Sequence, residues 1–438
     1  MVNNDKLSLF STVVTSKVAK GARLGEGLLN GVIGDHLHST SNGLSREMQF
    51  YKNNTPIELT SENIRVHYPE VSPKICILVH GLINDETIWN FPNQPNTNYG
   101  SIIQTEWDYT PLYLRYNTGI HISQNGKLLS HLIHKLLKVY PVEVKDIVII
   151  GHSMGGLATR SACYYAAFQG ADWTPKVSKI FFLGTPHLGA PLEKFGNAMT
   201  FLLKKIPNSY TNLTGDIINL RSAGIKDLRY GYLTDEDWQN HHPDQLLQNN
   251  KTVVPLLEHI SYYLITGTLT DGTDDLINQW FGDALVRKDS AKGQSKNKHH
   301  LFFNLKNHKE ITGLVHHKLV NSKEVYEQIR CWMNVKSKSK KSKITSLTQD
   351  FPAKSDNVIP SEPIHKASKL NGVSTLFIEG FKGGLCKLAE LNRSRITYKI
   401  LNNIPLVNIV SREIENVQVG FTEKILSKAI SAVEKMNN

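Results

Sequence analysis

The sequence lacks a long apolar run and contains few cysteines. None of its 438 residues lies in a stretch that approaches the ~20 consecutive apolar residues needed by a membrane-spanning helix. Lysine and arginine interrupt the short apolar patch in residues 1–25, and no cleavage pattern follows, so we expect no secretory signal. The four cysteines have no paired spacing and are expected to be reduced thiols. They are Cys76, Cys163, Cys331 and Cys386. These absences favour a globular cytoplasmic protein.

Motifs for metal and nucleic-acid binding are also missing. No HExxH or CxxC motif argues for a catalytic metal, and the histidine pairs at 241–242 and 299–300 do not have ligand spacing. The basic run KSKSKKSK at 336–343 has no aromatic residues among its lysines and lies in no recognised nucleic-acid-binding module. We therefore expect no metal and no specific nucleic acid.

Positive charge is concentrated toward the C-terminus. The net charge is +11, and residues 335–438 contain 17 Lys and Arg against 9 Asp and Glu. Residues 372–436 also have apolar residues at helical spacing. A basic, amphipathic segment of this kind can lie on an anionic membrane surface. A solvated linker followed by two helices packed on the body explains the same composition equally well, so both interpretations stay open.

From about residue 64 onward, apolar strands alternate with amphipathic helices. The continuous apolar runs KICILVHGL (74–82) and DIVIIG (146–151) are typical of strands buried on both faces. Further strands are expected over 110–117, 177–191 and 259–269, and helices over 125–141, 154–168 and 322–333. This alternation predicts parallel βαβ units. Residues 1–60 are expected to be helix followed by loop.

Composition divides the chain into four predicted segments. They are an N-terminal helical and loop segment (1–62), an α/β domain (63–334), a basic linker (335–371) and a C-terminal helical segment (372–438). Residues 192–258 have mixed helical and polar character without a clear strand, so we expect an insertion there.

Ser153 is the strongest candidate for a catalytic residue. It lies in Gly-His-Ser-Met-Gly (151–155), after a predicted strand and before a predicted helix. A G-x-S-x-G pattern in that context is typical of a nucleophile elbow, in which a sharp turn exposes the serine hydroxyl. The start of the following helix would favour a developing negative charge. The alternative is an ordinary serine in a glycine-rich turn.

Two backbone amides are candidates for stabilising that charge. The sequence His80-Gly81-Leu82 ends an earlier strand, where acyl-transfer hydrolases place one oxyanion donor. The residue after the nucleophile supplies the other. We therefore predict the N–H groups of Leu82 and Met154 as oxyanion donors, and we expect His80 itself to be structural.

A serine nucleophile needs a base and an orienting carboxylate, which follow the serine in this chain order. Asp283, in Gly-Asp-Ala-Leu-Val, follows a turn and is the favoured carboxylate. Four other aspartates are weaker alternatives: Asp271, Asp274, Asp275 and Asp289. The base is predicted among His316 and His317, on the loop before the last helix of the domain. Periodicity does not choose between these neighbours.

Several of these motifs resemble those of a known protein family. LVHGL, GHSMGGLATR and FLGTPHLGAP, in this order, resemble the lipase/esterase branch of the α/β-hydrolase superfamily. The group includes triacylglycerol lipases and GPI inositol-deacylase-like proteins, bacterial members among them. The resemblance covers about residues 70–333. GDALV resembles the group's GDGLV acid loop apart from Ala284, and GLVHHKLV resembles its G-x-x-H-x-x-L loop, which aligns His316 with the catalytic position.

The resemblance implies an α/β-hydrolase fold with a mostly parallel central sheet flanked by helices. It also implies a Ser153–His316–Asp283 triad, no cofactor, and a lid-like role for the insertion at 192–258. Three further stretches resemble bacterial members of the group without indicating a role in chemistry. They are residues 29–44, 115–126 and 221–233.

The expected function is carboxylic-ester hydrolysis through an acyl-enzyme, on lipid-like esters. Acyl transfer to an alcohol and thioester hydrolysis need the same triad and remain alternatives. A different alternative is a membrane-associated interaction protein with a vestigial hydrolase body. The expected location is the cytoplasm, with peripheral contact to an anionic membrane through the basic tail.

Overall fold

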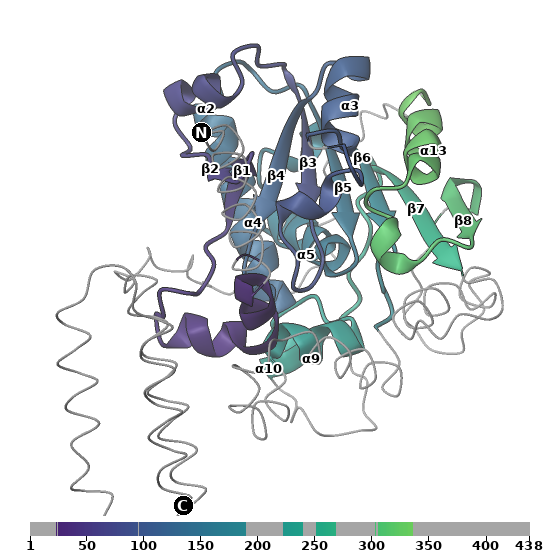
Figure 1. Ribbon diagram of the computed structural model, residues 1–438. Helices are drawn as coiled ribbons and strands as arrows, with labels where there is room; N and C mark the ends of the chain where they lie inside the picture. The colour runs from purple at the N-terminus through teal and green to yellow at the C-terminus, as the bar shows by residue number, and fades with distance from the viewer. Residues whose placement is uncertain are drawn as a thin grey trace, which may run out of the picture. The chain divides into compact units, whose positions relative to one another are not determined.

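The computed structural model describes residues 23, 25–94, 96–189, 222–239, 251–268, 303 and 305–335. These residues contain an eight-stranded sheet with the order β2-β1-β4-β3-β5-β6-β7-β8 (Figure 1). The strands are β1 (Gln49–Lys52), β2 (Thr55–Pro56), β3 (Lys74–Val79), β4 (Thr110–Arg115), β5 (Asp146–His152), β6 (Val177–Leu183), β7 (Ser261–Thr268) and β8 (His308–Thr312). β1 pairs antiparallel with β2 and β4, and every pairing from β4 to β8 is parallel.

Helices connect the strands and cover both faces of the sheet. The α-helices are a helix over residues 25–39, α2 (Ser61–His67), α3 (Tyr99–Trp107), α4 (Ile122–Val139), α5 (Met154–Gln169), α9 (Ala223–Tyr230), α10 (Glu236–Gln239) and α13 (Lys323–Met333). The short 3-10 helices are η1 (Glu86–Trp89), η2 (Thr174–Lys176), η3 (Leu305–Asn307) and η4 (His316–Lys318). This mostly parallel α/β architecture confirms the predicted fold class.

The apolar runs in the sequence form the two sides of the core. Ile75 and Ile77 of β3 belong to a cluster that includes buried residues of α4 and α5. Cys76 and Leu78 of the same strand belong to a second cluster, which includes buried residues of α3 and α13. Successive side chains of a strand point to opposite faces, so a strand covered on both faces must be apolar throughout. The continuous run in the sequence therefore predicted a central strand.

The edges of the sheet differ from the prediction. β1 and β2 lie within residues 1–60, which were expected to contain only helix and loop. β8, which has only Ile311 buried, and α3 were not predicted either. Edge strands are short and partly polar, so their sequences lack the apolar run that marked the central strands. The strand expected over 177–191 ends at Leu183, because Gly184 has a φ of +58° and begins a loop.

The parallel strands end at one edge of the sheet, and the loops that follow β3, β5 and β6 meet there. The Ser153 N–H after β5 donates to the Leu183 carbonyl at the end of β6 (2.9 Å), and the Gly184 N–H donates to the Ile265 carbonyl of β7 (2.9 Å). In open α/β sheets this carboxyl edge is where ligands bind. The fold therefore places the predicted catalytic serine at the expected edge.

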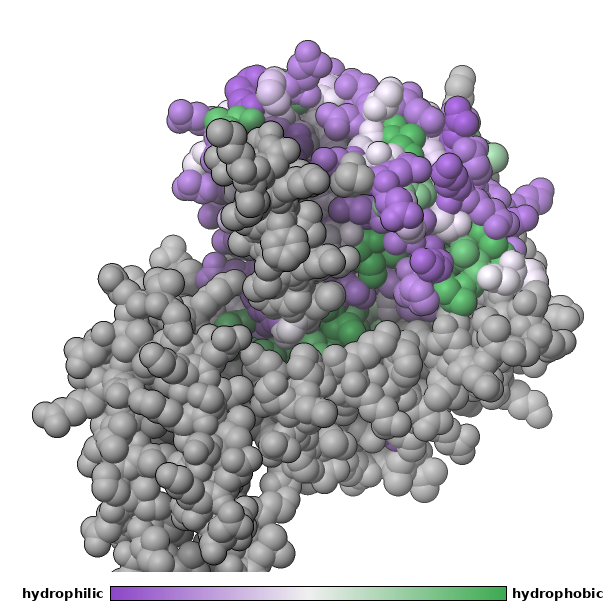
Figure 2. Space-filling view, in the orientation of Figure 1, coloured by the Kyte–Doolittle hydropathy of each residue, from purple (hydrophilic) through white to green (hydrophobic). Residues whose placement is uncertain are grey.

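Figure 2 shows one face of the molecule. The described residues on this face are mostly hydrophilic, and the hydrophobic areas among them are small and separate. Four large hydrophobic side chains are exposed among the described residues: Val66, Leu188, Val253 and Val335. Single exposed apolar residues of this kind are ordinary. Within the described ranges, no helix has both the length and the apolar character to cross a membrane. The linker beyond Val335 and the C-terminal segment lie outside the described residues.

Candidate active site

Ser153 lies at a strained junction between β5 and α5. It has a φ of 53° and a ψ of −124°, although it is not a glycine, and it is 3% exposed. A residue other than glycine at positive φ costs roughly 1–3 kcal/mol and persists only where the surroundings hold it. Here the Ser153 N–H donates to Leu183 and its carbonyl accepts from the Gly156 N–H (3.0 Å). This is the backbone geometry expected of a nucleophile elbow.

Close backbone contacts explain the small residues around the serine. A Cβ on Gly155 would lie 2.3 Å from the Val79 carbonyl oxygen and 2.4 Å from that of His80. A Cβ on Gly81 would lie 2.9 Å from the Cβ of Ser153. The turn after β3 therefore packs directly on the elbow. It brings Leu82 close to the serine, while Met154 begins the 16-residue helix α5, whose N-terminal end favours negative charge.

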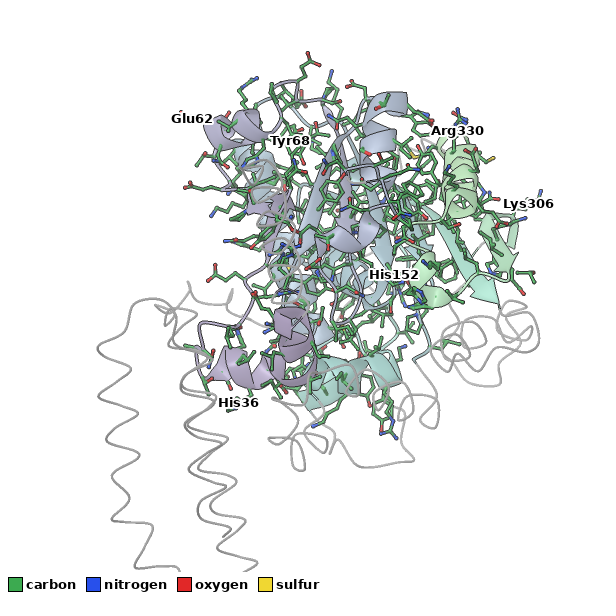
Figure 3. The ribbon with its side chains drawn as sticks, viewed as in Figure 1. His36, Glu62, Tyr68, His152, Lys306 and Arg330 are labelled. Atoms are coloured by element: carbon green, nitrogen blue, oxygen red, sulfur yellow. The ribbon has the colours of Figure 1, made fainter. Side chains whose placement is uncertain are left out.

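His316 is the histidine that the structure brings to the elbow. Its ring centroid lies 4.6 Å from that of His152, the residue before the serine. The His152 Nε2–H donates to the His316 carbonyl at 3.3 Å. Figure 3 labels His152 at the end of β5, beside the segment that carries η4. His152 thus contacts both the ring and the backbone of His316, a role that the sequence analysis missed.

Gly184 provides the space for the His316 ring. A Cβ at this position would lie 2.6 Å from the His316 Nδ1, and the φ of +58° itself favours glycine. His316 is buried at the first position of η4, whereas its neighbour His317 is exposed. The two histidines are therefore in different surroundings, and only His316 packs against the elbow. The G-T-P segment after β6 was the signal in the sequence that could have identified Gly184.

The predicted carboxylate belongs to a segment other than those described above. Asp283 and the alternatives Asp271, Asp274, Asp275 and Asp289 all lie outside the described residues. The structure thus places the His316 ring against His152, which precedes Ser153, and the Gly81 turn against Ser153 itself, and Asp283 remains a prediction.

His80 has the contacts of a structural residue. Its ring is fully buried and stacks on that of Tyr116, with centroids 4.6 Å apart. The Tyr116 hydroxyl donates to the His80 carbonyl (2.8 Å), and the His80 Nδ1 lies 2.8 Å from the Gly81 carbonyl. Burial lowers the pKa of His80 to about 3, so the ring is neutral. These contacts hold the end of β3 in place.

A buried ion pair anchors the C-terminal end of the loop that follows β3. The guanidinium of Arg115, at the end of β4, binds both carboxylate oxygens of Glu86, and the Nε–Oε2 distance is 2.6 Å. Arg115 is 7% exposed and Glu86 is 6% exposed. The guanidinium also lies 3.9 Å from the Tyr51 ring centroid. Bidentate geometry and burial make this pair stronger than a surface salt bridge.

Replacing Arg115 with methionine should lower the free energy of unfolding by about 3–5 kcal/mol, because the Glu86 carboxylate would stay buried without its cation. Urea unfolding followed by circular dichroism measures this change. Replacing both Arg115 and Glu86 with methionine should recover most of the loss, since no charge is then buried. A single variant as stable as the wild type would contradict the assignment.

In the part of the chain that the structure describes, no group of three or more His, Cys, Asp or Glu side chains is arranged to hold a metal ion. Among the described residues, this edge carries a serine, a histidine and backbone N–H groups. Such an arrangement suits nucleophilic attack on a carbonyl carbon.

Comparisons with known proteins agree with this geometry. Residues 113–270 match the family described as PGAP1-like alpha/beta domain, a range that includes β5, the elbow and α5. No curated protein sequence is significantly similar to the chain.

Solved structures of lipases and esterases are similar to the chain at low identity. A lipase-esterase related protein from Clostridium acetobutylicum is 15% identical, with 59% of this chain and 94% of that chain covered and a TM-score of 0.31. Esterase B from Lactobacillus rhamnosis is 13% identical, with coverages of 76% and 95% and a TM-score of 0.34. Lipase B from Aspergillus fumigatus is 10% identical, with coverages of 63% and 58% and a TM-score of 0.34.

The parallel strands, the G-x-S-x-G junction between β5 and α5, and the match over 113–270 agree with one another. The chain has a mostly parallel α/β fold, and its residues 113–270 are similar to the family described as PGAP1-like alpha/beta domain.

Proposed function

We propose that this protein is an α/β hydrolase and cleaves carboxylic esters with a Ser153–His316–Asp283 triad and an acyl-enzyme intermediate. The observation that carries the proposal is the strained elbow at Ser153 with the His316 ring packed beside it. The turn at Gly81, which lies against the serine, adds a source of backbone donors. Nucleophile, base and oxyanion donors are the groups that acyl transfer requires.

In the first step the Ser153 Oγ attacks the ester carbonyl carbon, and His316 accepts the hydroxyl proton. The C=O electron pair moves to the oxygen, and the N–H groups of Leu82 and Met154 stabilise the resulting anion. Collapse of this intermediate breaks the bond to the leaving alcohol, which takes the proton from His316. The acyl group remains on the serine.

In the second step a water molecule attacks the acyl-enzyme, with His316 again as the base. The carboxylic acid leaves, and the proton returns to Ser153. Burial, together with the nearby His152 and His317, holds the pKa of His316 well below its usual value, so the ring is in the neutral form that a general base requires. Asp283 would orient the ring and stabilise its protonated form during each step.

The proposed substrates are lipid-like esters, and the insertion at 192–258 is the proposed cover of an apolar acyl site. Its described parts pack against α5, as two hydrogen bonds demonstrate. The Ser161 Oγ donates to the Leu233 carbonyl (2.6 Å), and the Arg160 Nη2 donates to the Val254 carbonyl (2.9 Å). The basic C-terminal tail would hold the enzyme peripherally on an anionic membrane.

Fluorophosphonates with short and long alkyl chains test this function directly. The full chain should be labelled covalently at Ser153, as mapped by peptide mass spectrometry, because phosphorylation of the serine needs the same nucleophile, base and oxyanion donors. The long-chain probe should react faster if the acyl site is apolar. Heat-denatured protein is the control and should not react.

Absence of labelling at Ser153 would contradict the catalytic proposal and favour a vestigial site. Labelling with no preference for the long chain would contradict the lipid-like substrate and leave a general esterase.

A further inference from the structure

The loop that carries the proposed oxyanion donor Leu82 is strained at the next residue. Ile83 has a φ of 62°. A β-branched residue rarely adopts this conformation, which costs roughly 1–3 kcal/mol and persists only where neighbouring groups hold it. The contacts that hold Ile83 therefore also determine the direction of the Leu82 N–H, one peptide away.

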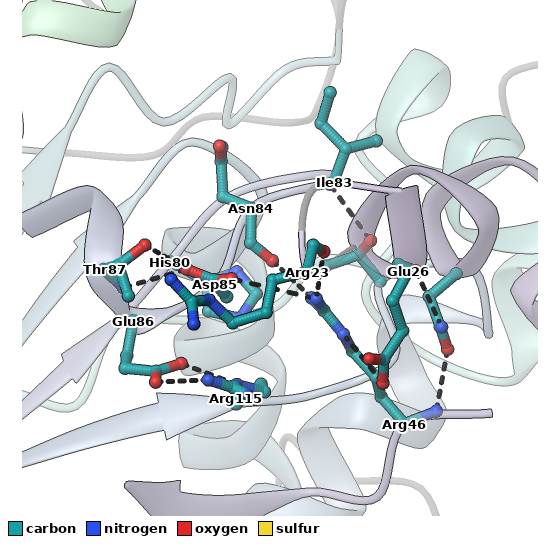
Figure 4. Close-up of polar contacts among 12 residues, drawn as sticks. Arg23, Glu26, Arg46, His80, Ile83, Asn84, Asp85, Glu86, Thr87 and Arg115 are labelled. Atoms are coloured by element: carbon teal, nitrogen blue, oxygen red, sulfur yellow. Dashed lines mark hydrogen bonds and ion pairs between the residues drawn. The ribbon is translucent and has the colours of Figure 1, made fainter. Parts of the chain in front are cut away.

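Two side chains from outside the loop bind its backbone. The Thr118 hydroxyl oxygen accepts the Ile83 N–H at 3.1 Å. The Arg46 Nη1 donates to the Asn84 carbonyl at 2.8 Å, as Figure 4 shows. Thr118 is buried at the exit of β4, and Arg46 is buried before β1. The peptide between residues 82 and 83 and the peptide between residues 84 and 85 are thus fixed from two sides.

The helix over residues 25–39 lies against the same loop. A Cβ on Gly27 would lie 2.4 Å from the Ile83 carbonyl oxygen, and one on Gly31 would lie 2.2 Å from the Ile83 Cγ2. The two glycines are four residues apart and therefore share one face of the helix. Their lack of side chains lets the helix backbone touch the strained residue.

The helix is itself fixed by two distant stretches of the chain. The Asn117 Nδ2 donates to the Gly34 carbonyl (2.8 Å), and the Ser222 Oγ donates to the Gly31 carbonyl (2.6 Å). The Gly224 N–H in turn donates to the Gly119 carbonyl (2.9 Å). Figure 1 shows the helix and α9 side by side. The stretches 29–44, 115–126 and 221–233, to which the sequence assigned no role, therefore form one unit.

Charge compensation keeps Arg46 in this position. Its guanidinium lies 3.7 Å from Glu26 at the Nε and 3.9 Å from Asp85 at the Nη2, and the Nη2 donates to the Arg23 carbonyl at 3.0 Å. Burial lowers the pKa of Arg46, and the two carboxylates oppose this effect. A buried cation with carboxylates from both the helix and the loop joins the two elements electrostatically.

We propose that this unit, an N-terminal brace made of residues 25–46, 117–119 and 222–224, positions the Leu82 N–H for the transition state. Thr118 and Arg46 are its positioning residues, acting through the backbone of Ile83 and Asn84. The inference depends on the ester hydrolysis proposed above. Its physical basis is that oxyanion donors are effective only when they are held in place before charge develops.

Thr118→Val tests the brace with the least change in shape, because valine keeps the volume of threonine and removes the acceptor of the Ile83 N–H. Loss of a whole oxyanion donor costs about 100–1,000-fold in kcat, so a displaced donor should cost about 10-fold. Thr118→Ser keeps the hydroxyl and should keep most of the activity. Thr174→Val, in η2 and outside the brace, is the matched control and should behave like the wild type.

The informative readout compares an ester with the thionoester of the same acyl and leaving groups. Sulfur accepts hydrogen bonds from N–H groups more weakly than oxygen, so a good oxyanion site favours the oxygen ester. Thr118→Val should lower kcat for the oxygen ester more than for the thionoester and leave KM nearly unchanged. Hydrogen exchange of the peptide containing residues 81–86 should become faster in the same variant.

The possible results distinguish failure of the proposed positioning role from failure of the proposed esterase function. Equal losses on both esters, or unchanged exchange in the loop, would overturn the proposal. If the wild type itself had no Ser153-dependent esterase activity, the proposed function would fail, and so would the positioning role. Should Thr118→Val not fold, Arg46→Lys allows the same comparison, since lysine keeps the charge but cannot reach several partners at once.

Discussion

Replacement of Ser153 with alanine should lower kcat for ester hydrolysis by about 10³- to 10⁶-fold. The variant keeps the fold because alanine removes only a buried hydroxyl at a position already held by backbone hydrogen bonds to Leu183 and Gly156. The acyl-enzyme cannot form without the Oγ, and any residual rate comes from substrate bound beside the oxyanion donors. Steady-state assays with a p-nitrophenyl ester measure the loss.

Ser161→Ala is the matched control for this experiment. Ser161 is also a buried serine of α5, and its hydroxyl binds the Leu233 carbonyl, away from the elbow. Its loss should cost about 1 kcal/mol of stability and leave catalysis largely unchanged. Undiminished turnover in Ser153→Ala, with the control also active, would disprove the proposed mechanism.

His316→Ala should lower kcat by about 10⁴-fold or more, because no other group at the elbow is proposed to take the serine proton. His317→Ala should have little effect, since His317 is exposed and the adjacent ring is the one that packs against His152. The pair separates two neighbours that periodicity leaves equivalent and that only the motif resemblance distinguishes. Both variants are assayed with the same ester as above.

His316→Gln provides a further control, because glutamine retains side-chain bulk and polarity without a basic ring. It should be nearly as inactive as the alanine variant if proton transfer is the role of His316. Melting temperatures close to that of the wild type would exclude loss of fold as the cause. Similar activity losses in the His316 and His317 variants would contradict the assignment of the base.

The central sheet and the elbow could be predicted because their signals are local. β3 is apolar at every position after its first residue, and β5 is apolar from Ile147 to Ile150, which follows from burial on both faces. The glycines at 151 and 155 mark the turn because the Val79 and Gly156 backbones leave no room for side chains. Each of these features can be read within a few neighbouring residues.

Edge strands and pairings between distant segments could not be predicted in this way. β8 has a single buried residue, Ile311, and β1 joins the parallel strands through its antiparallel pairing with β4. The energy of such strands comes from partners far along the chain, so their own composition carries little signal. The fold class was therefore predicted correctly, while its edges were not.

The sequence by itself determined the fold class and the position of Ser153, because burial on both faces and a tight turn each demand particular residues in a short stretch. Only the tertiary structure decided that His316 rather than His317 packs against His152, that Gly184 makes room for it, and that the Ile83 loop is braced. Those contacts join residues 35 to 164 positions apart, and nothing local in the chain encodes which of them will meet.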